Sequence, residues 1–203
     1  MEIHPLGERE ARAASRLLAR AFRDNLMNRA VLGRAGPSQR LRANTAGLRC
    51  QLGQALRVGR VLSLSEAGEL RGALISVPPG AYPLPLPPWL ERLRVARVQG
   101  PRAVSRWSWV AERLAELHPL EAHWTLSILG VDPPHTGRGL GSRLLLRFLE
   151  QVDGDGLPAY LETDAEANLR FYTRAGFRVV GELELLGVSI WRLRRPAAAS
   201  DAA

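Results

Sequence analysis

The chain has 203 residues, of which 46% are hydrophobic, and this length and composition suit one domain with a substantial core. No segment approaches the ~20 apolar residues that span a bilayer, and the first residues lack the basic and apolar regions of a secretory signal, so we expect a cytoplasmic protein without membrane contact. All 28 basic residues are arginines spread among acidic residues, so the net charge of +8 indicates a solvated basic surface rather than a nucleic-acid-binding one.

Residues that usually form disulfides or hold metals are sparse. Cys50 is the only cysteine, which excludes an intramolecular disulfide, and its place in a helical pattern predicts a half-buried apolar role. The four histidines are dispersed and show no metal-ligand spacing. We therefore expect no metal site.

The first part of the chain predicts helices packed against the start of a sheet. Apolar residues recur at helical spacing in two segments, and two alternating segments flank a turn, which is a hairpin signal. The expected elements are a strand at 3–6, an amphipathic helix at 8–25, a helix at 38–58 capped by Ser38, and strands at 60–65 and 69–77 joined at Ala67-Gly68.

The rest of the chain predicts a proline-rich loop and then a mixed sheet. Six prolines at 78–88 exclude a helix or a central strand there. The alternation of strands and helices after residue 123 implies a mixed α/β sheet. The expected elements are helices at 89–99 and 102–117, a strand at 124–131, a helix at 140–152, a strand at 158–163, a short helix at 166–175, strands at 177–185 and 188–193, and a disordered tail at 196–203.

A glycine-rich turn carries the strongest chemical signal. The strand at 124–131 runs into alternating glycines, Gly137, Gly139 and Gly141, and then into a helix. Glycine permits positive φ and has no β-carbon, so successive N–H groups can converge on one anion, and the helix start adds a partial positive charge. The pattern predicts a pyrophosphate-binding turn that needs no metal.

Other phosphate motifs fail at this turn. A dinucleotide fingerprint needs a glycine at position 142, which is Ser142, and a nucleotide P-loop needs a lysine, which the chain lacks. The remaining alternative is a turn whose glycines only let the helix and the strand pack closely.

Two motifs in this order resemble the GNAT superfamily of N-acetyltransferases. The first is Val-Asp-Pro at 131–133 followed by Gly-Arg-Gly-Leu-Gly at 137–141, and the second runs from Asn168 through Phe171-Tyr172 to Gly176-Phe177. His123-Trp124 and the Leu-Glu-Thr strand at 161–163 are most similar to the branch that contains puromycin N-acetyltransferase.

The resemblance implies an α/β (α+β) GNAT fold: a mixed, mostly antiparallel sheet with a central splayed strand pair, flanked by helices. It implies one domain at 1–195, with acceptor-side helices and loop at about 8–119 and an acetyl-CoA-binding core at about 122–181. The co-substrate is then acetyl-CoA, with the pantetheine arm added as an extra strand. Thr136 stands where glutamine or arginine is usual. The implied contacts are Leu129, Gly130, Val131, Thr136, Gly137, Arg138, Gly139, Leu140, Gly141, Ser142 and Asn168.

The same resemblance implies direct transfer of an acetyl group to an amine in a ternary complex. Tyr172 matches the family's general acid, which protonates the departing thiolate. Glu162 or His123 is the candidate base, with Glu162 preferred. Asn168 either holds the pantetheine arm or caps its helix.

The acceptor is expected to be a primary amine of a small molecule. A protein N-terminus or lysine is the alternative, and a non-catalytic acyl-CoA-binding module or a nucleic-acid-binding protein would be a rival of another class. Two roles are expected for the aromatic residues of this region. Either an apolar wall over the amine is formed by Tyr82, Trp107 and Trp109, or the tryptophans simply anchor their helices. The oligomeric state is left open, with a homodimer as one option.

Overall fold

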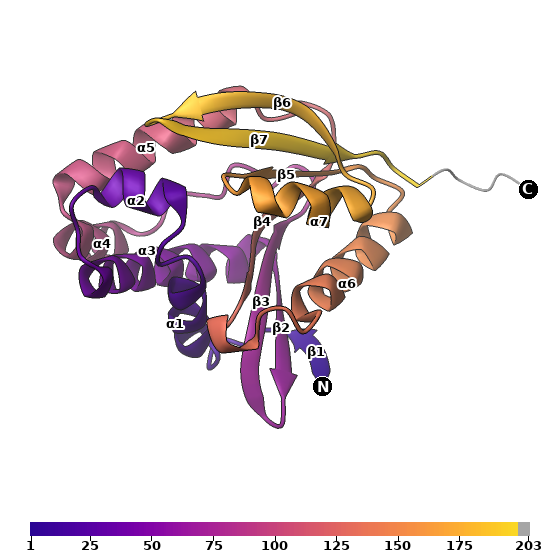
Figure 1. The fold of residues 1–203 in the computed structure, drawn as a ribbon, viewed down its shortest axis with the longest axis horizontal. Helices are drawn as coiled ribbons and strands as arrows, with labels where there is room; N and C mark the ends of the chain where they lie inside the picture. The colour runs from indigo at the N-terminus through magenta and orange to yellow at the C-terminus, as the bar shows by residue number, and fades with distance from the viewer. Residues whose placement is uncertain (199–203) are drawn as a thin grey trace, which may run out of the picture.

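The computed structural model describes residues 1–198 and shows one seven-stranded sheet with helices on both faces (Figure 1). The strand order is β1-β2-β3-β4-β5-β7-β6, and every neighbouring pair is antiparallel except β4 and β5. The strands are β1 (Glu2–Pro5), β2 (Arg60–Glu66), β3 (Glu69–Val77), β4 (Trp124–Val131), β5 (Ala159–Thr163), β6 (Arg178–Leu185) and β7 (Val188–Arg195). This is the expected mixed, mostly antiparallel sheet.

Seven helices and two 3₁₀ turns complete the described part of the chain. The helices are α1 (Ala11–Ala21), α2 (Leu26–Leu32), α3 (Pro37–Val58), α4 (Trp89–Gln99), α5 (Pro101–Glu116), α6 (Leu140–Gly154) and α7 (Leu169–Arg174), and the turns are η1 (Pro133–His135) and η2 (Glu166–Asn168). Residues 78–88 form neither helix nor strand, as their prolines predict. Of the tail expected to be disordered, 196–198 have no regular structure and 199–203 lie outside the described residues.

The structure corrects two helix predictions. The helix expected at 8–25 ends at Ala21, and a separate α2 follows because Asn25 caps it by accepting a hydrogen bond from the N–H of Asn28. Ser38 is not the N-cap of α3. Pro37 occupies the first helical turn after Gly36, where its missing N–H costs nothing, so Ser38 lies inside the helix.

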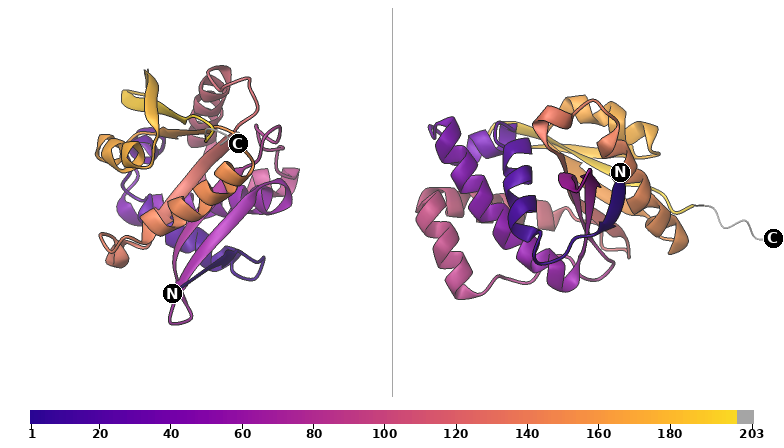
Figure 2. Two further views of the ribbon diagram at one scale, coloured as in Figure 1. Left: turned by 90° about the vertical axis from the view of Figure 1, so that its right-hand side faces the viewer. Right: turned by 90° about the horizontal axis from the view of Figure 1, so that it is seen from below.

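The sheet separates two groups of helices (Figure 2). On one face α6 and α7 bury an apolar core against β4, β5 and β7. The apolar stripe of α6 faces this core as its periodicity predicts, with Leu144 and Val152 fully buried. On the other face α1 and α3 pack on β2 and β3, and α2 and α5 pack on β7. Among residues 1–198, no helix combines the length and the apolar character needed to cross a membrane.

The two central strands diverge. β4 pairs with β5 only at Trp124–Leu126, opposite Ala159–Leu161, so the remainder of β4 has no strand on that side. The β3–β4 register shifts at the same level: Ile75 faces Ile128 and Ser76 faces Leu126, which leaves Ser127 as a bulge. The bulge and the lost pairing produce the expected splayed pair and leave an open edge on β4.

Candidate active site

The glycine turn at the start of α6 is open toward solvent. Gly137 and Gly139 have φ of 76° and 77°, a region that favours glycine, and a β-carbon at either position would meet no atom within 4 Å. Gly139 is the N-cap of α6 and offers no side chain to its first turn. The conformation therefore requires glycine, and the space above it is free.

Backbone donors line this open space. In the described part of the chain, no backbone oxygen accepts a hydrogen bond from the N–H groups of residues 137–142. The first N–H groups of a helix have no partner within the helix and carry the positive end of its dipole. Together they form a cradle of backbone donors, the kind of arrangement that binds anions at helix N-termini.

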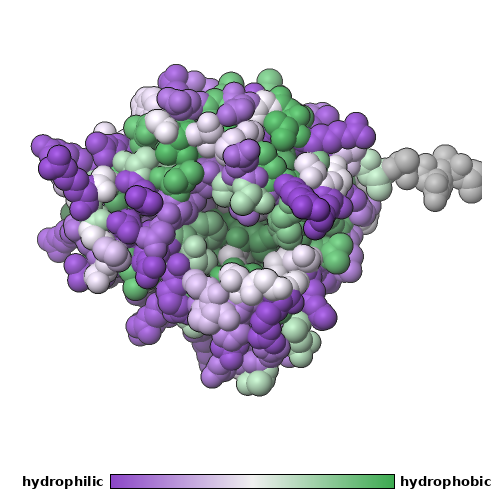
Figure 3. All heavy atoms as spheres, in the orientation of Figure 1, coloured by the Kyte–Doolittle hydropathy of each residue, from purple (hydrophilic) through white to green (hydrophobic). Residues whose placement is uncertain are grey.

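A cavity of about 370 Å³ lies at the cradle. Figure 3 shows the corresponding face hollowed between α7 and the loop that precedes α6. Phe171 of α7 closes one side: a β-carbon at position 141 would lie 3.9 Å from its Cζ. The cavity is lined by Val131, His135, Thr136, Gly137, Gly139, Leu140, Gly141, Ser142 and Phe171. Seven of the contacts expected from sequence thus lie together here: Val131, Thr136, Gly137, Gly139, Leu140, Gly141 and Ser142.

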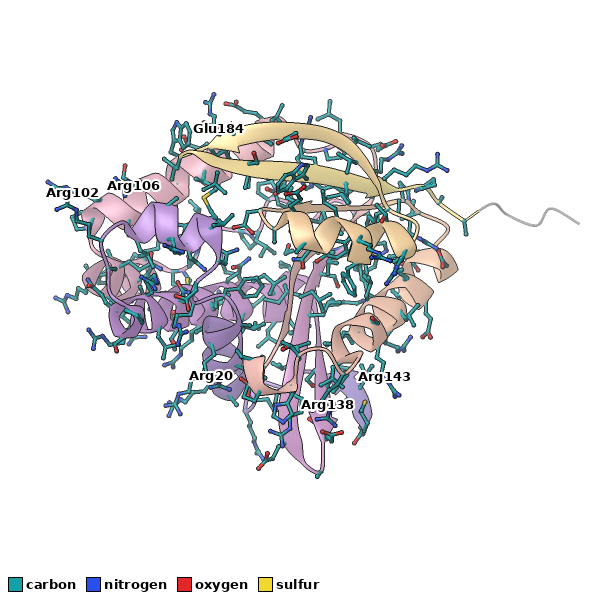
Figure 4. All side chains as sticks on the ribbon, viewed as in Figure 1. Arg20, Arg102, Arg106, Arg138, Arg143 and Glu184 are labelled. Atoms are coloured by element: carbon teal, nitrogen blue, oxygen red, sulfur yellow. The ribbon has the colours of Figure 1, made fainter. Side chains whose placement is uncertain are left out.

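The side chains of Thr136 and Arg138 bond to groups of the protein itself. The Thr136 hydroxyl donates to the carbonyl oxygen of Pro133 at 3.0 Å, which stabilises the turn. Arg138 donates to both carboxylate oxygens of Glu66, at 3.0 and 2.9 Å, and lowers the pKa of Glu66. Figure 4 shows Arg138 with Arg143 near the loop, and Arg20 on α1 beside it. The guanidinium of Arg138 is thus bound to a carboxylate, and the backbone supplies the cradle.

The β4 residues before the turn face both sides of the sheet. Leu129 packs against the α6 and α7 core. A β-carbon at position 130 would lie 2.5 Å from Cδ2 of Leu18, so Gly130 is required because α1 packs directly on its backbone. The acetyl-CoA contacts predicted for these two residues therefore require their backbone groups along the open edge of β4.

Tyr172 lies on α7 beside the cavity. Its side chain is buried, with its ring 4.9 Å from that of Phe171 and 6.0 Å from that of Phe177, measured between centroids. Burial raises the pKa of Tyr172 to about 12, so the hydroxyl is protonated at neutral pH and can act only as a donor of its proton. Asn168 precedes α7, is exposed, and makes no capping hydrogen bond.

Glu162 lies on the opposite face of β5. Ala159 and Leu161 point to the α6 and α7 core, so Tyr160 and Glu162 point to the face covered by α1 to α5. The Tyr160 hydroxyl donates to Oε1 of Glu162 at 2.9 Å. Burial raises the pKa of Glu162 to about 7, although the Tyr160 hydrogen bond and the charge of Arg192 act against it. A carboxylate with this pKa suits proton exchange near neutral pH.

Both ring nitrogens of His123 are hydrogen-bonded to neighbouring groups of the protein. Its Nδ1 lies 2.6 Å from the carbonyl oxygen of Glu121 and its Nε2 lies 2.9 Å from Nε2 of His118. With both ring nitrogens bonded within the protein, His123 is less suited than Glu162 to accept a proton from a substrate. Sequence reasoning missed His118 and Tyr160. The i, i+2 spacing of Tyr160 and Glu162 on one strand is the signal that predicts the second of these.

The structure distinguishes the two roles considered for the aromatic residues, a wall over the amine or the anchoring of helices. Trp107 packs with α2 and β7 in the apolar cluster on their side of the sheet, which supports its anchoring role. Trp109 is 41% exposed. Tyr82 instead stacks on His118, with centroids 3.6 Å apart and planes 11° from parallel. In residues 1–198, no group of three or more His, Cys, Asp or Glu side chains is placed to hold a metal ion.

Sequence comparisons match the part of the chain that carries this site. Residues 110–177 match the model of the Acetyltransferase (GNAT) family. The chain is 38% identical over 69 residues to the N-alpha-acetyltransferase RimI of Mycobacterium tuberculosis, a segment that covers 34% of this chain and 42% of RimI. It is 32% identical over 94 residues to the mycothiol acetyltransferase of Kineococcus radiotolerans, covering 44% of this chain and 28% of that protein. The chain therefore matches less than half the length of either relative.

The whole fold matches solved acetyltransferase structures. A crystal structure described as histone acetyltransferase HPA2 and related acetyltransferase, from Corynebacterium glutamicum, superposes with a TM-score of 0.76 over 98% of both chains, at 19% identity. The fold is that of the GNAT superfamily. The family model matches the segment that carries the glycine turn and α7, within this fold.

Proposed function

We propose that the protein is an acetyl-CoA-dependent N-acetyltransferase that acetylates a primary amine of a small molecule by direct transfer. The carrying observation is the open cradle at 137–142, with its unpartnered N–H groups, next to the unpaired edge of β4. The pyrophosphate of acetyl-CoA fits the cradle, and the pantetheine arm adds to β4 as an extra strand.

In the proposed reaction, the base Glu162 and the acid Tyr172 act from opposite faces of the sheet. Glu162 accepts one proton from the ammonium of the acceptor. The neutral amine forms the C–N bond at the thioester carbonyl, N–H groups of the splayed part of β4 stabilise the oxyanion, and the C–S bond breaks with its electron pair on sulfur. Tyr172 protonates the sulfur. The new amide nitrogen loses a second proton, the Tyr172 phenolate regains one, and one proton is released overall.

The relatives support two kinds of acceptor. The mycothiol acetyltransferases favour a small molecule, as does the resemblance of the motifs to the puromycin N-acetyltransferase branch. RimI is named as an N-alpha-acetyltransferase, so a protein N-terminal amine is the second candidate. The loop that carries Tyr82 and the α5 helix with Trp109 would contact the body of either acceptor, and Asn168 would contact the pantetheine arm.

The test is acetylation of a panel of amines. The reaction is monitored through the release of CoA and through the mass of the product. We expect acetyl-CoA to bind by calorimetry and at least one small primary amine to gain an acetyl group. Transfer to peptide N-termini but to no small molecule would select the alternative acceptor. Acetyl-CoA binding with no transfer to any amine or peptide would contradict an enzymatic role.

A further inference from the structure

A cluster of aromatic and polar side chains surrounds Glu162 on the acceptor side of the sheet. Tyr82 comes from the proline-rich loop, His118 from the segment after α5, and Tyr160 from β5. The His118 ring stacks on Tyr82 at 3.6 Å and meets the Tyr160 ring edge-on at 4.9 Å. Three segments far apart in sequence thus converge on one carboxylate.

Hydrogen bonds fix the orientation of His118. The carbonyl oxygen of Glu121 only accepts, so Nδ1 of His123 carries a proton, and in neutral His123 the Nε2 atom is then an acceptor. Nε2 of His118 therefore donates to it at 2.9 Å, with the Thr125 hydroxyl 3.2 Å from the same nitrogen. Nδ1 of His118 is buried without a partner. Burial, and secondarily the neighbouring His123, lower the pKa of His118 to about 4, so this ring is neutral.

Tyr82 is held against this fixed ring. Its side chain is half-buried, and one face of its ring lies on His118. Burial, and secondarily the negative charge of Glu162, raise the pKa of Tyr82 to about 12, so its hydroxyl is protonated at neutral pH. The surrounding prolines limit the freedom of the loop, so the ring is largely preorganised.

The carboxylate of Glu162 lies on the other side of this cluster. Tyr160 is 1% exposed and holds Glu162 through its hydroxyl, so it cannot contact a substrate. Arg192 is the charged residue opposite Glu162 in the sheet register. Its guanidinium donates to the carbonyl oxygen of Leu117 at 3.1 Å. It also lies over Gly181 of β6, where a β-carbon would collide with it. Within residues 1–198, Glu162 therefore has no direct ion pair with an arginine.

We propose that the ammonium group of the acceptor binds at the carboxylate of Glu162 and against the ring of Tyr82, and that His118 positions Tyr82 for this contact. The inference rests on the proposed acetyltransferase function and deepens it by assigning the amine subsite. An aromatic face attracts a cation, and a half-buried carboxylate binds an ammonium more strongly than an exposed one does. The acceptor thus binds in its protonated form, and Glu162 then accepts the proton that must leave before attack.

The test compares amines with their isosteric alcohols. Pairs such as 2-phenylethylamine and 2-phenylethanol are titrated onto the full chain in the presence of CoA, which prevents turnover. We expect each bound amine to have a Kd at least about tenfold below that of its alcohol, because only the amine carries the charge. Glu162→Gln should remove this preference while leaving the Kd of acetyl-CoA unchanged. Equal binding within every pair, or no binding by any amine, would overturn the assignment.

Variants of the aromatic pair test positioning. Tyr82→Ala should raise the Kd of the amine about fivefold or more, whereas Tyr82→Phe, which keeps the π face, should not. His118→Leu should weaken amine binding without changing the Kd of acetyl-CoA, and His118→Phe should restore amine binding by restoring the stack. Trp89→Ala removes another aromatic side chain, 69% exposed on α4, and serves as the control. Unchanged amine binding in Tyr82→Ala would contradict the proposal. If acetyl-CoA itself failed to bind the unmodified protein, the proposed function would fail instead.

Discussion

The Tyr160 hydroxyl donates a 2.9 Å hydrogen bond to Oε1 of Glu162, two residues further along the same strand. The Tyr160 side chain is buried and cannot move freely. Its hydrogen bond therefore fixes the Glu162 carboxylate at the point where β5 diverges from β4. The same bond favours the charged form of Glu162 and opposes the burial that raises its pKa to about 7. Under the proposed mechanism, Tyr160 therefore sets the pH range in which Glu162 acts as a base.

Removal of this hydroxyl should shift the pH dependence of catalysis. Glu162 accepts protons only when deprotonated, so kcat/KM for the amine should rise with pH through about 7. Tyr160→Phe removes a group that stabilises the carboxylate, so the pKa of Glu162 rises and the midpoint of the profile moves to higher pH. The measurement is kcat/KM from pH 5.5 to 9 for both proteins. An unchanged midpoint would exclude control of Glu162 by Tyr160.

Tyr172→Phe should separate catalysis from binding. The substitution keeps the buried ring and its contacts with Phe171 and Phe177 but removes the proton donor. We expect kcat to fall by about 10²-fold or more, with the Kd of acetyl-CoA and the Tm nearly unchanged. Steady-state kinetics beside calorimetry provide the measurement, and a pre-steady-state burst would reveal rate-limiting product release. Near-normal single-turnover rates would remove Tyr172 from the mechanism.

Gly130→Ala should destabilise the fold. The new β-carbon would lie 2.5 Å from Leu18 and 3.2 Å from Phe22, so α1 must shift away from the sheet. Overpacking of this kind lowers the free energy of unfolding by about 1–3 kcal/mol. Gly154→Ala is the control, because a β-carbon at the end of α6 meets nothing within 4 Å. Urea denaturation measures both, and equal stability of the two variants would contradict the close α1 contact.

The sequence predicts the sheet and most helices because their signals are local. The hydrophobic stripe of α6 and the Ala67-Gly68 turn, with φ of 52° and 77°, follow from periodicity and turn chemistry alone. The division of residues 8–32 into two helices does not. It depends in part on Asp164, which accepts hydrogen bonds from Asn25 and from the N–H of Met27, more than one hundred residues away.

The candidate site divides in the same way. The cradle is a continuous segment whose glycines identify it, so most of its residues could be predicted. The cluster of Tyr82, His118 and Tyr160 around Glu162 could not, because it forms only when the proline-rich loop and the end of α5 fold over β5. Neither segment has a motif, and a stacked His–Tyr pair leaves no spacing signal.

The proposed binding of acetyl-CoA at the glycine turn can be tested by the Kd of acetyl-CoA for two matched variants. Gly139→Glu and Gly156→Glu each place the same side chain on a glycine of positive φ, 77° and 64°, with no atom within 4 Å of the new β-carbon. The backbone strain is therefore similar, but the two positions flank opposite ends of α6, roughly 25 Å apart. We expect Gly139→Glu to raise the Kd at least about a hundredfold, because its carboxylate enters the pyrophosphate cradle, while Gly156→Glu leaves the Kd unchanged. Equal affinities for Gly139→Glu and the unmodified protein would show that acetyl-CoA does not bind at the glycine turn.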